Sequence, residues 1–310
     1  MTGERAIVLG VPRSGTTFLM RALGCLPEAE CVSGNLLPVG IAHLAAQELD
    51  GQVRDALERS FRVGLGDYLT TSLYHARSAA LRKWWVSGRQ RATLTTAIKG
   101  KRIEQMLIYK EPFLAFAPGY AYRALPDARL LYLFRDGRDV ADSLVRSYDV
   151  LTDEKLSSLE SDEVQIGRKL GDRYVPWWVG DGQGDGERFL AASPYLRAVW
   201  MWREMVRRCG EFFDQREVTV SGRVLRVRYE DLIGDPFTQG NAIVEHLGLE
   251  MTTTMRKQLA GAHPRSIGIH QRRDRDELAA AEQLAGTELA ALGYPLLTRG
   301  EPRASVLARQ

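Results

Sequence analysis

The feature that most constrains the fold is a strand, a glycine-bearing loop and a helix within RAIVLGVPRSGTTF, residues 5–18. A short apolar run ends at Gly10, and apolar residues recur at helical spacing from Phe18 to Leu23. Gly10 and Gly15 stand five residues apart, as in a phosphate-binding loop. The first N–H groups of a helix have no partner within it and carry partial positive charge. The segment therefore predicts an anion site at a strand-to-helix turn.

This loop lacks the lysine of nucleoside triphosphatases, because position 16 is Thr16. That lysine reaches the β- and γ-phosphates, so its absence argues against handling a transferred phosphoryl group. Arg13 lies inside the loop instead and can meet one phosphate as a planar fork. With the N–H groups and hydroxyls of Ser14 to Thr17, the loop suits a single phosphate or a phosphosulfate group and requires no metal.

A second apolar strand at residues 130–134 runs directly into RDGRDVADS. Asp139 is the residue expected to cap the following helix. Arg135 at the strand end, with Ser143 eight residues later, predicts a second anion site in the same sheet. The alternative is a turn held only by ion pairs among four neighbours, Arg135, Asp136, Arg138 and Asp139.

The remaining segments continue the alternation of strands and helices. A strand is expected at 223–229, a helix from Asp235-Pro236 to Gly248, and a last helix at about 276–293. This order predicts an α/β fold, a P-loop-like three-layer sandwich whose central parallel sheet has helices on both faces. We expect one domain over residues 1–310, with acceptor-site insertions at about 36–109, mostly helical, and 150–195, a long loop or flap.

Composition excludes several functional classes. Apolar residues make up 45% of the chain and the net charge is only +3, so nucleic acid is not an expected partner. No run of eighteen apolar residues indicates a membrane span, and because the chain enters a strand almost at once, no signal peptide is expected. Three cysteines without a C-x-x-C pair, and five scattered histidines, favour a reduced cytoplasmic protein without a metal.

Five motifs in this order resemble those of sulfotransferases that use 3′-phosphoadenosine 5′-phosphosulfate (PAPS), especially the bacterial and tyrosylprotein branches. They span nearly the whole chain. The motifs are PRSGTT (12–17), YKEPF (109–113), FRDGRDVADS (134–143), RVRYEDLIGDP (226–236) and the degraded segment SIGIHQRRD (266–274).

The resemblance implies a role for each matching residue. The first loop would bind the 5′-phosphosulfate, Tyr229 would pack beside the adenine, and Lys110 would neutralise the sulfuryl group during transfer together with Arg13. The residues implied in binding the 5′-phosphosulfate are Arg13, Ser14, Gly15, Thr16 and Thr17. Those implied near the 3′-phosphate are Arg135, Ser143, Ser266 and Gly268.

The general base departs from the family pattern. Ser33, Gly34 and Asn35 stand where the family often has a glutamate or histidine, and an asparagine is no base at neutral pH. His43 is the first titratable candidate, and Glu48 and Glu111 are alternatives. An unseen residue, an already acidic acceptor or an absence of catalysis also stay open.

The predicted function is transfer of a sulfuryl group from PAPS to a hydroxyl of a small molecule or carbohydrate, leaving 3′,5′-adenosine bisphosphate (PAP). Two rivals are a catalytically idle nucleotide-binding protein of the same fold and a P-loop kinase. Trp177 and Trp178 either stack on the acceptor or anchor a loop. No membrane partner is expected, and a homodimer is left open.

Overall fold

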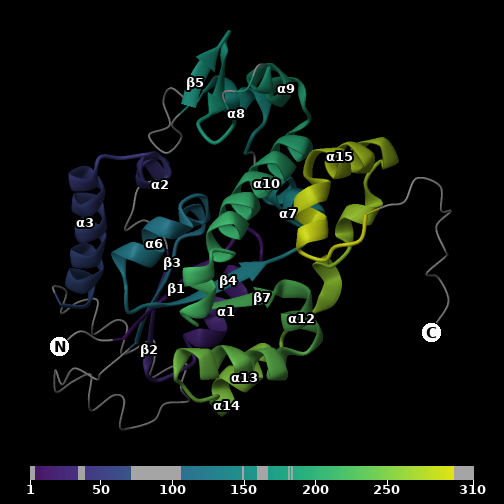
Figure 1. Ribbon diagram of the computed structural model, residues 1–310. Helices are drawn as coiled ribbons and strands as arrows, with labels where there is room; N and C mark the ends of the chain where they lie inside the picture. The colour runs from purple at the N-terminus through teal and green to yellow at the C-terminus, as the bar shows by residue number, and fades with distance from the viewer. Residues whose placement is uncertain are drawn as a thin grey trace, which may run out of the picture.

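A parallel sheet forms the centre of the molecule (Figure 1). The computed structural model describes residues 4–33, 39–70, 106–148, 150–158, 167–180, 182 and 184–296. Five strands pair in the order β2-β3-β1-β4-β7, and every pairing is parallel, so their carboxyl ends share one edge. The strands are β1 (Arg5–Leu9), β2 (Ala29–Ser33), β3 (Met106–Lys110), β4 (Arg129–Phe134) and β7 (Val224–Arg228).

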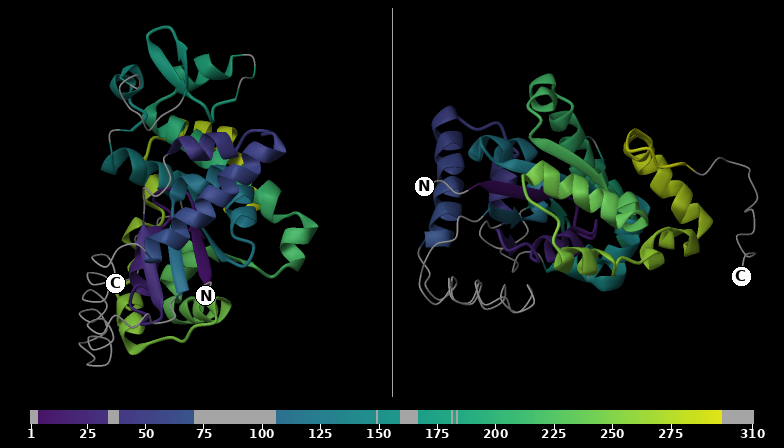
Figure 2. Two further views of the ribbon diagram at one scale, coloured as in Figure 1. Left: turned by 90° about the vertical axis from the view of Figure 1, so that its left-hand side faces the viewer. Right: turned by 90° about the horizontal axis from the view of Figure 1, so that it is seen from below.

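Helices cover both faces of this sheet, which confirms the predicted three-layer fold (Figures 1 and 2). Successive strand side chains point to opposite faces, so Ile7 and Leu9 join one core and Ala6 and Val8 the other. The first core includes residues of α3 (Gly51–Thr70), α6 (Pro118–Ala124), α7 (Gly137–Ser147), α10 (Pro194–Phe213) and α15 (Arg275–Ala291). The second includes residues of α1 (Thr16–Leu23), α13 (Pro236–Leu247) and α14 (Thr253–Leu259).

The predicted strands at 130–134 and 223–229 correspond to β4 and β7. Asp235 caps α13 by accepting a hydrogen bond from the N–H of Thr238, and Gly248 ends it in the left-handed conformation. Shorter elements complete the chain. They are α2 (Val39–Ala45), η1 (Pro112–Phe116), α11 (Arg216–Val220), α12 (Tyr229–Gly234), η3 (Pro264–Ser266) and η4 (Ile269–Arg272).

The two expected insertions differ from their predicted form. The range 36–109 contains most of β3, which is a strand of the central sheet between β2 and β1. Residues 71–105 lie outside the described residues. The range 150–195 contains regular structure in place of one long loop. Its elements are α8 (Asp153–Ser157), the antiparallel hairpin of β5 (Gly167–Leu170) and β6 (Arg173–Pro176), and α9 (Asp185–Ala191).

No helix in the described ranges combines the length and the apolar character that crossing a membrane requires.

Candidate functional site

Three cationic side chains meet at the carboxyl edge of the sheet. Arg13 follows β1, Lys110 ends β3 and Arg135 follows β4. Because β1 lies between β3 and β4, these segments are neighbours in space although they are far apart in the sequence. Ligands of open α/β sheets bind at such a point, where the chain leaves β1 in one direction and returns on the other side. All three side chains line one cavity of about 600 Å³.

The loop after β1 forms the floor of this cavity. Gly15 has a φ of 91° and is the N-cap of α1, with no side-chain cap on the helix. A Cβ on Gly15 would lie 2.3 Å from the ring of Tyr229, so only glycine lets the loop pack on that ring. Thr16 and Thr17 also line the cavity, while Ser14 is fully buried. The N-terminus of α1 thus lies at the cavity, and the anion site expected there stays a prediction.

Arg13 reaches toward α7. Its φ of 74° is left-handed, a conformation uncommon for residues other than glycine. Its Nε donates to the Oγ of Ser143 at 3.0 Å and its Nη2 to the Oγ of Ser147 at 3.3 Å. The structure therefore joins the first predicted anion site to the second through Arg13 itself.

Arg135 is the buried cation of the site, with only 3% of its surface exposed. It donates to the carbonyl oxygens of Arg13, at 3.2 Å, and Ser266. Its guanidinium lies 4.6 Å from the centre of the Tyr229 ring. These contacts hold the Arg135 guanidinium at the cavity wall. They also bring together the end of β4, the loop after β1 and the segment around Ser266.

Asp139 does not cap α7, contrary to the sequence prediction. Asp136 does so, accepting from the N–H of Arg138. Asp139 is buried and accepts hydrogen bonds from the backbone N–H of Gly268 at 2.7 Å, the backbone N–H of His270 at 3.0 Å and the ring Nδ1 of His270 at 2.6 Å. It also lies 3.6 Å from Arg135.

The Asp139 carboxylate thus fastens the segment after α14 to α7. Gly268 is not among the described residues that line the cavity, and its N–H donates to Asp139. Ser266 does line the cavity, and its Oγ lies 3.4 Å from the hydroxyl of Tyr229. The predicted ion-paired turn also exists, through the Asp136–Arg138 pair at 2.7 Å, so the two alternatives for this motif are compatible.

Replacing Asp139 with asparagine is expected to lower the free energy of unfolding by about 1.5–3 kcal/mol at pH 7, the range for hydrogen bonds to a charged group. Burial raises the pKa of the Asp139 carboxyl, but hydrogen bonds from His270 and Gly268 outweigh it, and the net pKa is lowered. Because the pKa of Asp139 is lower in the folded protein than in the unfolded chain, its ionised carboxylate stabilises the fold at pH values above the ordinary carboxyl pKa. This stabilisation is lost as the pH falls through the pKa of the folded protein.

Urea unfolding of wild type and Asp139→Asn at pH 7 and at pH 3 tests this. The difference between the two proteins should shrink at pH 3. Asp127→Asn, at an exposed position, is the control and should change neither value. An equal difference at both pH values would contradict the role of the ionised carboxylate.

Lys110 stands across the cavity from α7. Its Nζ donates to the Oγ1 of Thr17 at 3.3 Å, at the start of α1. Burial lowers the pKa of Lys110, although the neighbouring Glu111 carboxylate opposes the shift. Glu111 itself caps η1 by accepting from the N–H of Phe113 at 3.2 Å. Glu111 therefore has a structural role in the turn that follows Lys110.

His43 is not among the residues that line the cavity. Its ring packs edge-on against Trp177, with 4.8 Å between ring centres, and Trp177 does line it. Burial lowers the pKa of His43, and its Nε2 lies 2.8 Å from the amide nitrogen of Gln47. A neutral imidazole has one acceptor nitrogen, and in His43 that nitrogen already accepts the hydrogen bond from Gln47. It is therefore not free to take a proton from an acceptor. The role of His43 as base stays a prediction, and this geometry does not favour it.

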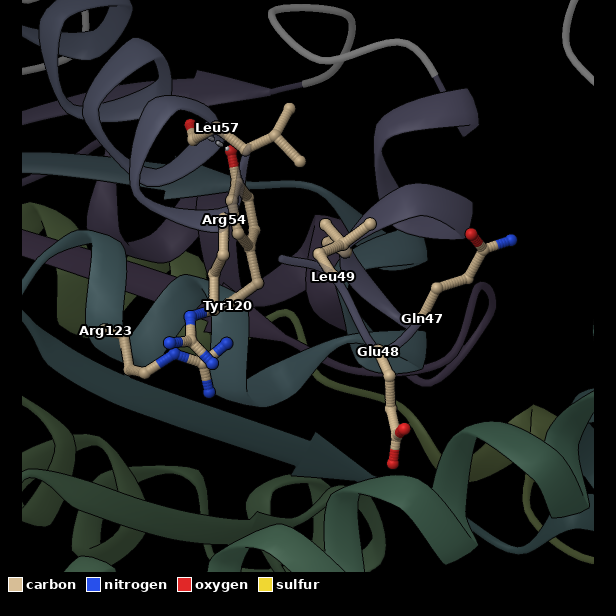
Figure 3. A pocket seen from close by; sticks show the side chains of 8 residues that line it. Gln47, Glu48, Leu49, Arg54, Leu57, Tyr120 and Arg123 are labelled. Atoms are coloured by element: carbon tan, nitrogen blue, oxygen red, sulfur yellow. Dashed lines mark hydrogen bonds between the residues drawn. The ribbon is translucent and has the colours of Figure 1, made fainter. Parts of the chain in front are cut away.

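Glu48 lies at a separate cavity of about 360 Å³ between the end of α2, α3 and α6 (Figure 3). The Tyr120 hydroxyl closes one wall by donating to the carbonyl of Leu57 at 3.0 Å. Glu48 does not line the larger cavity, so it is a poor candidate for the base. Of the positions expected to hold the base, Ser33 ends β2, whereas Gly34 and Asn35 lie outside the described residues.

The structure adds residues that the motifs did not reveal. Ser147 follows Ser143 by one helical turn and contacts the same arginine, a spacing that the sequence did contain. His263 lines the polar side of the cavity. Apolar side chains from separate elements form the other side, and no local sequence pattern connects them. They include Phe113, Leu144, Leu151, Pro176, Trp177 and Met201.

Within the described ranges, no group of three or more histidine, cysteine, aspartate or glutamate side chains could hold a metal ion.

The chain is similar to a known family in sequence and to solved structures in fold. Residues 6–183, more than half of the chain, match the model of a family described as the sulfotransferase family. No curated protein matches the chain. Among solved structures, the chain is similar to the sulfotransferase domain of the Synechococcus PCC 7002 olefin synthase, with 19% identity, a TM-score of 0.52 and coverage of 95% of this chain and 96% of that one. It is also similar to the sulfotransferase domain from the curacin biosynthetic pathway, with 16% identity, a TM-score of 0.50 and coverage of 96% and 99%.

Proposed function

Because the chain belongs to the sulfotransferase family, we propose that it transfers a sulfuryl group from PAPS to the hydroxyl of an acceptor bound in the same cavity. The observation that carries this proposal is the meeting of Arg13, Lys110 and Arg135 at one cavity, with no carboxylate among its described lining residues. A donor nucleotide with separate phosphate groups at its 3′ and 5′ positions matches such a set of cations.

The residues present fit this nucleotide. Two buried polar atoms, the Oγ of Ser14 and the Nε of Arg135, have no hydrogen-bond partner within the described part of the chain. Buried polar groups are rarely left without a partner, so the Nε of Arg135, a residue that lines the cavity, supports an anion at this wall, whereas Ser14 does not line the cavity. The N-terminus of α1 adds backbone N–H groups and a partial positive charge. The Tyr229 ring, packed against Gly15 and Arg135, offers a surface for the adenine.

Each phosphate group has its own set of donors in this proposal. Arg135, Ser143 and Ser266 hold the 3′-phosphate. Arg13 joins them, because its side chain is bonded to Ser143, and this shifts it from the sulfuryl group to which the sequence had assigned it. The loop from Ser14 to Thr17 holds the 5′-phosphosulfate. PAPS supplies an activated sulfuryl group whose departure leaves negative charge on the 5′-phosphate side.

Lys110 is the residue that we assign to charge stabilisation. Its ammonium group lies beside Thr17 at the helix start, where negative charge increases during transfer. A donor fixed in a partly buried site stabilises such charge more than water would. The partial burial that lowers its pKa also limits competition from solvent. The acceptor proton leaves to a base that the described residues do not identify.

Thermal unfolding with PAP, compared with magnesium ATP, tests the nucleotide assignment. At a hundred times its dissociation constant, PAP should add about 2.7 kcal/mol to the free energy of unfolding. Thr16 replaces the lysine that a kinase loop uses, so magnesium ATP at the same concentration should add much less. Stabilisation by magnesium ATP alone would overturn the proposal in favour of a kinase. Stabilisation by neither would show that the two anion sites do not serve one nucleotide.

A further inference from the structure

We propose that the acceptor is an uncharged, largely apolar alcohol or phenol and not a sugar. This inference rests on the proposed function, since it assigns the part of the cavity that the nucleotide leaves free. The polar half of the lining belongs to the strand ends and to the segment around Ser266. The other half is apolar and comes from η1, α7, the segment after α7, the end of β6 and α10.

The chemistry of that apolar half is selective. Among the described residues that line the cavity there is no aspartate, glutamate, asparagine or glutamine. A sugar brings many hydroxyls, and each one buried without a partner costs free energy. Phe113, Trp177 and Met201 instead offer ring and thioether surfaces, which stabilise apolar bodies. The cations at the strand ends disfavour a positively charged acceptor.

Aromatic packing holds this wall in place. The rings of Trp177 and Trp178 contact Phe116, with ring centres 5.0 and 5.9 Å apart, and Phe113 stacks on Phe116 at 6.4 Å. Phe116 belongs to the main core and is 1% exposed. The two tryptophans therefore anchor the segment, one of the two alternatives that the sequence left open, and both line the cavity, while stacking on an acceptor stays a prediction.

Leu151 is an apolar residue of the cavity wall whose backbone adopts the left-handed conformation, which residues other than glycine rarely adopt. Arg13 and Leu151 are the two non-glycine residues with positive φ in the described ranges, and both line this cavity. Leu151 has a φ of 62° and is 3% exposed. Buried Arg197 donates to its carbonyl at 2.7 Å and to the Asp153 carboxylate at 2.7 Å. Such strain persists only where the surroundings enforce it, often at functional sites.

The position of Phe113 links this wall to the reacting group. Lys110 and Phe113 are joined by a short turn that Glu111 caps, and both line the cavity. An acceptor whose body contacts Phe113 therefore lies beside the Lys110 ammonium group. A phenol would also reduce the need for a strong base, because its hydroxyl is more acidic than that of an aliphatic alcohol.

The test uses 2-naphthol as the apolar probe and methyl β-glucopyranoside as the sugar. Calorimetry first measures binding of PAP, and then binding of each probe to the PAP-bound protein. Sulfation with PAPS is followed by the release of PAP. We expect naphthol to bind and to be sulfated with a kcat/KM at least about 100-fold above that of the sugar.

Phe113→Ala should raise the KM for naphthol about tenfold or more and leave the Kd for PAP unchanged. The matched control is Phe237→Ala, on the surface of α13, which should change neither constant. If Phe113→Ala does not fold, Phe113→Leu serves, with a smaller rise in the KM for naphthol and the same Kd for PAP.

Two results would overturn the inference while the proposed function stands: PAP-bound protein that fails to bind naphthol, or a higher kcat/KM for the sugar. A protein that does not bind PAP would instead remove the proposed function and this inference together. The PAP titration therefore separates the two failures before any acceptor is added.

Discussion

Replacing Lys110 with alanine is expected to lower kcat for sulfuryl transfer by about two to three orders of magnitude, the usual effect of removing one charge-stabilising donor. The Kd for PAP should change far less. The Lys110 Nζ lies 3.3 Å from the Thr17 hydroxyl at the start of α1. The residues proposed for the 3′-phosphate lie elsewhere: Arg13 and Arg135 follow β1 and β4, Ser143 is on α7 and Ser266 is in η3. Lys110 thus acts on charge that develops during transfer more than on the bound nucleotide.

The pH dependence offers a second readout for Lys110. Its ammonium group must be protonated to stabilise negative charge, and burial lowers its pKa. Activity should therefore decline at a lower pH on the alkaline side than an ordinary lysine would produce. In Lys110→Arg the decline should move to higher pH, because a guanidinium does not titrate in this range.

Kinetics of Lys110→Ala beside Lys257→Ala check this expectation. Lys257 is exposed on α14 and serves as the matched control. PAP titration by calorimetry should give the same Kd for Lys257→Ala and wild type, and a Kd for Lys110→Ala that differs far less than its kcat does. An unchanged kcat in Lys110→Ala would exclude its catalytic role. Absence of turnover in wild type, despite tight PAP binding, would favour the idle nucleotide-binding protein.

Replacing Arg135 is expected to have the largest effect on nucleotide binding. Arg135→Ala should weaken PAP binding by about 2–5 kcal/mol, the range for truncating a buried charged partner, or about 30-fold to a few thousand-fold in Kd. Arg135→Lys should recover only part of this loss, because an ammonium group cannot reproduce the planar fork. The fork is 3% exposed and held by two backbone carbonyls and the Asp139 carboxylate.

The decisive measurement is the ratio of affinities for PAP and for 5′-AMP, which lacks the 3′-phosphate. Wild type should prefer PAP strongly, and Arg135→Lys should lose most of that preference. Because the ratio is measured on one folded protein, a general loss of stability does not change it. Arg226→Ala, on the exposed side of β7, is the control and should keep the full preference. A preserved ratio in Arg135→Lys would contradict recognition of the 3′-phosphate by this residue.

Local signals identified most of the polar half of the site. Gly10 and Gly15, with a strand before and a helix after, predict a turn with unpaired N–H groups at a helix start, which suits an anion, and this depends only on neighbouring residues. Arg135 could be placed because the residue after a buried parallel strand must lie at the carboxyl edge of the sheet. The alternation of strands and helices likewise determined the layered fold.

The Asp139 prediction was wrong because capping was judged from sequence distance alone. Asp136 and Asp139 both stand near the start of α7, and either could accept a first-turn N–H. Burial decided between them: Asp139 is inside, against Gly268 and His270, which are more than a hundred residues away in the chain. Gly268 was assigned to the nucleotide from the family resemblance; that role stays a prediction, and the contact of its N–H with Asp139 could not be seen from its own segment.

The sequence by itself thus determined the class of fold, the strand edge that bears the site and most of the polar groups on it, because short-range periodicity and turn chemistry encode these. Only the tertiary structure decided that Arg13 turns toward Ser143, that His43 packs on Trp177 outside the cavity, and that Phe113, Leu151 and Met201 form one apolar wall. These contacts join η1, the segment after α7 and α10. No periodicity records them, since they arise when separate elements pack over the sheet.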